Sequence, residues 1–279
     1  MINTEFSALL FGGAVAAGLI GSLTGLGGGV VIVPLLTVGF GVDIRYAIGA
    51  SLISVIATSS GAAAAYVREG YSNVRVGMLL EIATSAGALA GAALAASVPT
   101  AALAILFGCV LLFSAFAPAG ERRSPVGNAE AAATLGGRLG LNSSYPTSQG
   151  MKAYTVERVP LGFGLMGIAG MLSGLLGIGS GAVKVLAMDL AMGLPFKVST
   201  TTSNFMIGVT AAASAGVYLH RGYVDPGLVM PVMLGVVAGS LTGAKLLTRL
   251  TSSRLRVIFR AVIVVLGVEM IYNGWSGRI

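Results

Sequence analysis

Gly25-Leu26-Gly27-Gly28-Gly29 is the stretch that decides the fold, and Gly177-Ile178-Gly179-Ser180-Gly181 repeats its pattern 152 residues later. Both stretches interrupt long apolar runs. In a bilayer every backbone N–H and C=O group needs a partner, so a glycine-broken helix is stable only where protein buries it or where it lines a cavity. Two such breaks at corresponding positions of two halves are typical of a membrane transporter's binding site.

The composition is that of an integral membrane protein. Of the 279 residues, 55% are hydrophobic and 10% are charged, and the mean hydropathy is +0.90. A soluble domain carries about 25% charged residues, so this chain has too few polar side chains to cover a globule. The net charge of +7 comes from basic residues that lie mostly at the ends of apolar segments, which favours membrane orientation over nucleic-acid binding.

The apolar segments form two sets around a polar stretch. A bilayer core of about 30 Å needs about 20 helical residues, so 29–40 and 181–193 are too short to span easily and are expected to be half-helices in re-entrant hairpins. We expect an all-α polytopic membrane protein with a first transmembrane repeat at 1–118, a linker loop at 119–158 and a second repeat at 159–279, each with about four spanning helices. The segments are 7–24, 29–40, 44–67, 75–97, 100–118, 160–176, 181–193, 198–219, 226–247 and 256–274.

The two halves align without a gap at an offset of 152 residues. Aromatic, hydroxyl and glycine positions agree in one register, which chance does not readily supply and which indicates homologous repeats. The matched pairs are Gly18, Gly25, Gly27, Gly29, Val31 and Val33 with Gly170, Gly177, Gly179, Gly181, Val183 and Val185; Ser51, Tyr66, Gly70 and Tyr71 with Ser203, Tyr218, Gly222 and Tyr223; and Gly87, Leu89, Gly91, Ala92 and Leu94 with Gly239, Leu241, Gly243, Ala244 and Leu246.

The positions of the basic residues favour inverted over parallel repeats. If each glycine-broken region turns back as a hairpin, thirteen basic residues fall on one side of the membrane and Arg45, Arg221 and Arg278 fall on the other. The positive-inside rule then predicts a cytoplasmic linker and outside termini. The thirteen are Arg68, Arg75, Arg122, Arg123, Arg138, Lys152, Arg158, Lys197, Lys245, Arg249, Arg254, Arg256 and Arg260.

The breaks themselves are the predicted anion site. A helix that resumes after a break presents free N–H groups and the positive end of its dipole, so we expect the backbone of both breaks to bind substrate near the midplane. The alternative is that these glycines only allow tight helix packing. The residues concerned are Gly25, Gly27, Gly28, Gly29, Gly177, Gly179, Ser180 and Gly181.

Lys184 is the strongest single candidate for a charged residue in the anion site. It lies three residues past the second break among apolar side chains, where an ionisable group costs at least about 2.5–3.5 kcal/mol to insert. It can attract an anion, pair with Asp189 or Glu81, or extend to an interface. Its counterpart in the first half is Ile32, so its role is asymmetric.

Polar residues on the following helices complete the predicted site. Ser51, Ser203 and Asn204 can donate to an anion without a charge, or can hydrogen bond to a neighbouring helix. Glu81, about two turns into its segment, is a candidate proton-coupling carboxylate, whereas Asp189 lies nearer a segment end and is expected at the interface. No catalytic residues, metal site or cofactor site can be assigned.

On these residues the chain resembles the sulfite exporter TauE/SafE family of membrane permeases. The resemblance rests on Gly25 to Gly29 with Pro34, Ser173 to Gly181, Pro195 to Asn204, and Tyr218 to Tyr223. One departure is Ser180, which stands where that family commonly has a glycine.

The resemblance implies a secondary transporter in a prokaryotic inner cell membrane. Its substrate would be a small anion such as sulfite, another sulfur oxyanion or an organosulfonate, moved by alternating access. An anion channel and a transporter of organic carboxylates are the alternatives. The expected partners are the substrate and the lipid bilayer; no nucleic acid is expected, and a homodimer stays open.

Overall fold

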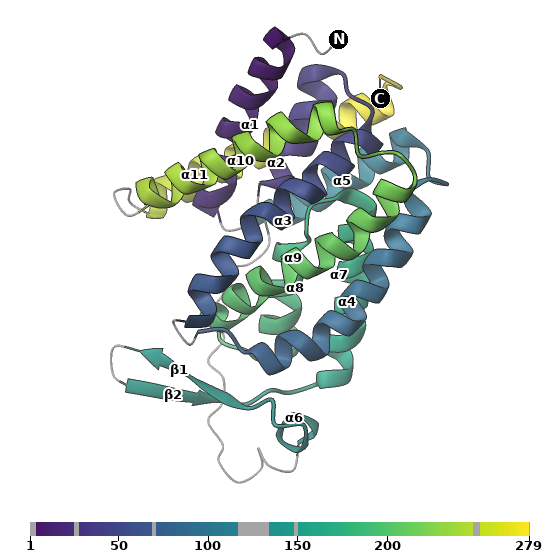
Figure 1. The fold of residues 1–279 in the computed structure, drawn as a ribbon. Helices are drawn as coiled ribbons and strands as arrows, with labels where there is room; N and C mark the ends of the chain where they lie inside the picture. The colour runs from purple at the N-terminus through teal and green to yellow at the C-terminus, as the bar shows by residue number, and fades with distance from the viewer. Residues whose placement is uncertain are drawn as a thin grey trace.

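The computed structural model describes residues 4–24, 28–68, 71–116, 134–147, 150–247 and 252–278. Helices make up most of this part of the chain (Figure 1). The first half contains α1 (Thr4–Thr24), α2 (Gly29–Pro34) with the π-helical turn η1 (Leu35–Gly39), α3 (Ile44–Arg68), α4 (Val74–Ala95) and α5 (Thr100–Phe116). The second half contains α7 (Val159–Leu176), α8 (Gly181–Leu186) with the π-helical turn η2 (Ala187–Ala191), α9 (Phe196–His220), α10 (Pro226–Leu247) and α11 (Ser252–Trp275).

Several of these helices are suited to crossing a membrane. Within the described residues, four contain apolar stretches of at least 18 residues, namely Thr4–Gly21, Val74–Ala95, Val159–Leu176 and Pro226–Gly243. Their lipid-facing side chains include Leu9, Met78 and Ile82, which are 63–66% exposed. Apolar side chains exposed along a helix of this length belong in hydrocarbon, so the chain is a multi-pass membrane protein.

Glycines set how closely the helices pack. α4 packs along α7, where Gly87 lies against the Gly167 carbonyl and Gly170 against the Thr84 carbonyl. α1 packs along α10 in the same way, with Gly239 against the Val15 carbonyl and Gly18 against the Val236 carbonyl. A Cβ at any of these four glycines would overlap the facing backbone, so small residues are what allows this packing.

The central helices α3 and α9 run in opposite directions beside each other (Figure 1). Arg45 at the start of α3 donates to the Val98 carbonyl at 3.1 Å, and Arg221 just after α9 donates to the Ala93 carbonyl at 3.1 Å. The start of α3 and the end of α9 therefore meet the same end of α4. At the other end, Thr202 near the start of α9 accepts a hydrogen bond from the Asn73 N–H at 3.0 Å.

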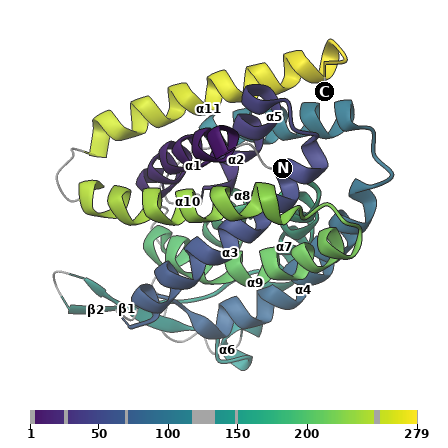
Figure 2. The same cartoon turned by 45° about the horizontal axis from the view of Figure 1, so that its top comes forward.

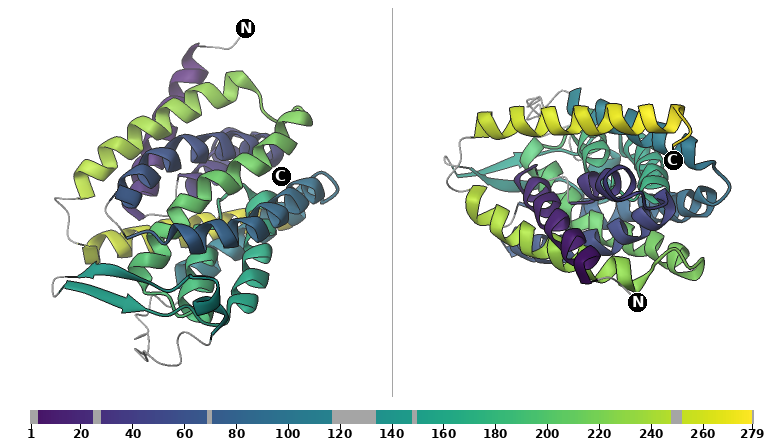
Figure 3. Two further views of the ribbon diagram at one scale, coloured as in Figure 1. Left: turned by 60° about the horizontal axis from the view of Figure 1, so that its bottom comes forward. Right: turned by 90° about the horizontal axis from the view of Figure 1, so that it is seen from above.

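The outer helices complete the bundle. Figure 2 shows α11 along one side of the molecule, and it packs against α5. Seen from above, α11 lies on one side and α1 with α10 on the other (Figure 3, right). Both termini lie at the end of the molecule opposite to the segment that joins the two halves (Figure 1).

The joining segment has more structure than its composition predicted. The described part of 119–158, expected to be a loop, contains α6 (Leu135–Arg138) and an antiparallel hairpin of β1 (Ser143–Thr147) and β2 (Gly150–Tyr154) (Figure 3, left). Asn73, the N-cap of α4, donates to the Leu141 carbonyl at 2.9 Å and to the Tyr154 hydroxyl at 2.8 Å. Burial raises the pKa of the Tyr154 phenol, although the hydrogen bond from Asn73 opposes this shift.

Asp189 is more deeply buried in protein than a charge at a segment end suggests. It was predicted at the membrane interface because it lies near a segment end, yet it is only 2% exposed. The turn η2 packs against α7 and α9, and the Met192 carbonyl that follows it accepts a hydrogen bond from the Glu157 N–H, just before α7, at 3.0 Å. Burial by neighbouring helices does not set the depth of Asp189 in the bilayer, so its interfacial position stays a prediction.

Candidate functional site

At the second glycine break the backbone adopts left-handed conformations, which end α7 before α8 begins. α7 ends at Leu176, and Gly177 and Gly179 both have φ +67°. Ser180 follows with φ +46°, a conformation that costs a residue with a Cβ about 1–3 kcal/mol. This explains why glycine is favoured at this position, and it makes Ser180 a strained residue in the interior of the protein.

The two breaks meet. Ser51 on α3 donates to the Gly177 carbonyl at 2.7 Å. A Cβ built on Gly29 would lie 2.7 Å from the Ser51 hydroxyl oxygen and 2.9 Å from the Gly177 carbonyl oxygen. The start of α2 thus touches the end of α7, and residues 148 positions apart in the sequence (177 − 29) form one contact.

Ser203 plays a similar part in the second half. Its hydroxyl donates to the Gly181 carbonyl at 3.2 Å, at the start of α8. Ser51 and Ser203, which were predicted either to bind substrate or to satisfy a neighbouring helix, here donate to the carbonyls of the second break. In this conformation both serines position the break rather than present a free hydroxyl.

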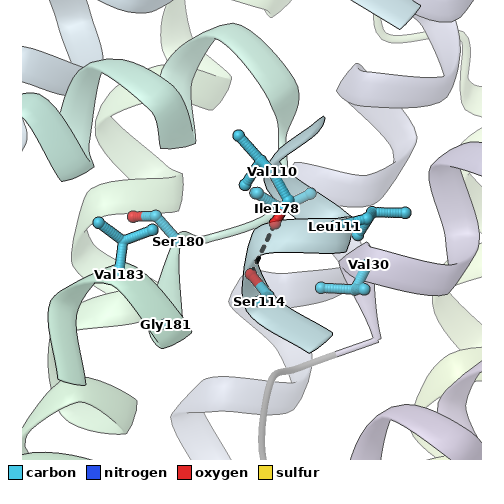
Figure 4. A pocket seen from close by; sticks show the side chains of 8 residues that line it. All are labelled: Val30, Val110, Leu111, Ser114, Ile178, Ser180, Gly181 and Val183. Carbon is cyan, nitrogen blue, oxygen red and sulfur yellow. Dashed lines mark hydrogen bonds between the residues drawn. The ribbon is translucent and has the colours of Figure 1, made fainter. Parts of the chain in front are cut away.

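A small cavity lies between the breaks and α5 (Figure 4). Val30 from the first break faces Ile178, Ser180, Gly181 and Val183 from the second, and Val110, Leu111 and Ser114 of α5 close it. The cavity has a volume of about 10 Å³. The Ser180 hydroxyl is buried and, among the described residues, has no hydrogen-bond partner.

Lys184 lies one residue beyond this cavity and is fully buried. Its ammonium donates to the Thr210 hydroxyl on α9 at 2.6 Å, and that hydroxyl donates to Glu81 Oε1 on α4 at 2.7 Å. Ser85 also donates to Glu81 Oε1 at 2.8 Å. The sequence left Asp189 and Glu81 open as partners for Lys184; the structure joins it to Glu81 through Thr210.

This chain of hydrogen bonds, which we call the Lys184–Thr210–Glu81 network, crosses between the halves. Glu81 is 8% exposed, and its second oxygen, Oε2, accepts no hydrogen bond from the described residues. An isolated buried charge costs many kcal/mol, whereas two opposite charges joined by a hydroxyl compensate each other. The network therefore keeps two ionisable groups in the interior at zero net charge.

The remaining predicted residues fall into two groups. Gly25 and Gly27 lie outside the described residues, while Gly28 packs against Val236 and Asn204 is half-buried on α9. No three His, Cys, Asp or Glu side chains cluster as metal ligands in the described ranges.

Sequence reasoning missed Thr210, Ser85 and Ser114. Thr210 had a detectable signal, because it lies seven residues after Ser203 and so on the same face of α9. Ser85 lies four residues after Glu81 and had the same kind of signal. Ser114 had none, since its hydroxyl bonds to the carbonyl of Val110 in its own helix.

Three curated proteins are similar to this chain over most of its length. It is 28% identical over 267 residues to the "Probable membrane transporter protein YunE" of Bacillus subtilis (strain 168), covering 92% of this chain and 94% of that protein. It is 28% identical over 229 residues to the "Probable membrane transporter protein YdhB" of the same organism, covering 82% and 85%. A "Probable membrane transporter protein" of Xylella fastidiosa (strain 9a5c) is 23% identical over 271 residues, with 95% of each chain covered.

No solved structure matches the chain. The family described as Sulfite exporter TauE/SafE matches residues 10–270, a range that includes both glycine breaks, Ser51, Glu81, Lys184 and Thr210. The chain belongs to the sulfite exporter TauE/SafE family.

Proposed function

We propose that the protein is a secondary transporter of small anions that works by alternating access between two inverted repeats. The observation that carries this proposal is the meeting of two glycine breaks beside a buried ionic network, inside a bundle of apolar helices. Family membership and relatives named as probable membrane transporters agree with it.

The inverted repeat is supported by equivalent contacts at the sequence offset of 152. On α4, Gly87 packs against Gly167 of α7, and at the corresponding positions Gly239 of α10 packs against Val15 of α1. Gly170 against Thr84 corresponds to Gly18 against Val236. The antiparallel course of the corresponding helices α3 and α9 is what an inverted pair requires.

The substrate would bind between the breaks when the cavity beside Ser180 enlarges. Backbone N–H groups at the breaks would bind its oxygens, with Lys184 as counter-charge. Ser51 and Ser203 would donate neutral hydrogen bonds once the break releases them from the Gly177 and Gly181 carbonyls, together with Asn204, and Glu81 would exchange a proton. The cavity described above, about 10 Å³, is too small to hold such an anion without this enlargement.

Sulfur oxyanions and organosulfonates are the proposed substrates. They present several oxygens to convergent donors, and the family description names sulfite. Organic carboxylates present oxygens to the same donors and are the second candidate. A channel would need a continuous polar pore, whereas the described cavity is small and mostly apolar.

Transport by proteoliposomes tests the proposal. The purified protein is reconstituted, and uptake of radiolabelled sulfite, thiosulfate, a sulfonate and a carboxylate is measured. We expect saturable uptake of at least one sulfur anion, accelerated by the same anion unlabelled on the opposite side. Linear, non-saturating flux without counterflow would identify a channel, and no flux of any of these anions would contradict the proposal.

A further inference from the structure

The Thr210 hydroxyl lies within hydrogen-bond distance of one donor and of two oxygens that compete for its single hydrogen when Glu81 is ionised. Its oxygen lies 2.6 Å from Lys184 Nζ, 2.7 Å from Glu81 Oε1 and 2.9 Å from the Met206 carbonyl oxygen. A hydroxyl has one hydrogen to donate and two lone pairs that accept. The ammonium can only donate, so the single Thr210 hydrogen points either to Glu81 or to Met206.

These two choices correspond to two protonation states of Glu81. When the carboxyl is ionised, Thr210 accepts from Lys184 and donates to Oε1. When Oε1 carries a proton, the carboxyl donates to Thr210, and the Thr210 hydrogen turns to the Met206 carbonyl. Thr210 accepts from Lys184 and donates its hydrogen in both states, so the contact between Thr210 and Glu81 Oε1 is kept whether or not Oε1 carries a proton.

Charge balance gives this switch a function. With Glu81 ionised, the Lys184–Thr210–Glu81 network has zero net charge. An anion that enters beside Lys184 would leave one uncompensated negative charge in the interior, which is costly. If Glu81 takes up one proton from the water at the same time, the charge returns to zero.

The other ionisable groups near Lys184 and Glu81 lie toward the ends of the helices, so these two residues are each other's main charged neighbours. Among the described residues on α4 and the elements packed against it, Arg75 and Lys197 lie at the hairpin end, where Arg75 donates to the Gly140 carbonyl and Lys197 lies over the Tyr71 ring. Tyr218, His220 and Arg221 lie at the opposite end of α9, and Asp189 is buried on η2. α7 carries no ionisable side chain between Val159 and Leu176.

We propose that Thr210 is a hydrogen-bond switch that couples uptake of a proton by Glu81 to binding of the anion beside Lys184. The proton enters from the aqueous phase with the anion, remains on Glu81 during the transition, and is released on the opposite side with the anion. Thr210 acts as a positioning residue. This inference rests on the proposed anion transport.

The test measures proton movement together with anion uptake. Proteoliposomes contain a pH-sensitive dye, and uptake of a radiolabelled sulfur anion is followed in the same vesicles with and without an imposed pH gradient. For the parent protein we expect the lumen to acidify as the anion enters, and uptake to rise when the outside is more acidic.

Substitutions separate the switch from a merely structural role. Thr210→Val, which keeps the shape but lacks the hydroxyl, should lose the response to the pH gradient and carry clearly fewer protons per anion than the parent, because the hydrogen bond that links Lys184 to Glu81 is absent. Thr210→Ser should keep both.

The matched control is Thr58→Val on α3, at the corresponding position 152 residues earlier. Thr58 bonds to the Ser54 and Val55 carbonyls of its own helix, and its replacement should leave the ratio unchanged.

Glu81→Gln provides a second route if the valine variant does not fold. Its amide can donate to Thr210 as the protonated carboxyl would, so anion counterflow should continue while proton movement is lost. A parent protein that takes up no anion would overturn the proposed function and this inference with it. Anion uptake without acidification, or a Thr210→Val or Glu81→Gln protein with the parent's proton ratio, would overturn the switch alone.

Discussion

Replacing Lys184 with methionine is expected to destabilise the protein and to abolish most anion uptake. Lys184 is fully buried and is joined to Glu81 through Thr210, so its loss leaves a carboxylate without its counter-charge. Breaking a buried ion pair from one side costs about 3–5 kcal/mol. Thermal unfolding in detergent micelles should therefore begin at a clearly lower temperature than in the parent.

The double variant Lys184→Met/Glu81→Gln separates stability from transport. With both charges removed, most of the lost stability should return, since a neutral pair often replaces a buried ion pair without cost. Uptake should stay about 10- to 100-fold below the parent, because a hydrogen bond to a charged group contributes about 1.5–3 kcal/mol. Lys152→Met on the exposed strand β2 is the control for loss of a positive charge. A stable double variant that transports like the parent would show that Lys184 is not the counter-charge of the anion.

Gly170→Ala is expected to destabilise the protein by about 3 kcal/mol, at the upper end of the range for overpacking. The new Cβ would overlap the Thr84 carbonyl, and backbone cannot move aside as the end of a flexible side chain can. Gly164→Ala on the same helix is the matched control, because no atom lies within 4 Å of its Cβ position. Alanine there should be neutral or stabilise by up to about 1 kcal/mol.

The corresponding contact on the other pair of helices should respond alike. Gly18→Ala would place a Cβ against the Val236 carbonyl, whereas Gly12→Ala on the same helix meets no atom within 4 Å. Unfolding temperatures of the four variants give the comparison. If Gly170→Ala unfolds at the same temperature as Gly164→Ala, or Gly18→Ala at the same temperature as Gly12→Ala, close packing at these glycines does not stabilise the protein.

The helices could be predicted closely from the sequence, because the bilayer demands long apolar segments. The predicted segment 226–247 coincides with α10, and 198–219 falls within α9 (Phe196–His220). The hairpin of β1 and β2 could not be predicted, since half of its side chains face water and hydrophobic alternation is weak. The π-helical turns η1 and η2 likewise have no signal in a hydrophobic pattern.

The sequence pointed to several residues of the candidate site, but not to the hydrogen bonds that join them. The glycine breaks, Lys184 and Glu81 were identified because glycine and charge are unusual in apolar segments. Their partners depend on which helices pack together, and spacing along one helix does not contain that information. Thr210 joins Lys184 to Glu81 only because α8, α9 and α4 come together in space.

The most direct test of the central claim is protection of a cysteine between the glycine breaks by the transported anion. Ser180→Cys is introduced after Cys109, the single cysteine of the chain, has been replaced by serine. The rate of its modification by a positively charged thiol reagent is measured in proteoliposomes at increasing anion concentration. An anion that binds between the breaks should slow the modification, with half-protection at the concentration that half-saturates transport. An unchanged modification rate at anion concentrations that saturate uptake would contradict the claim.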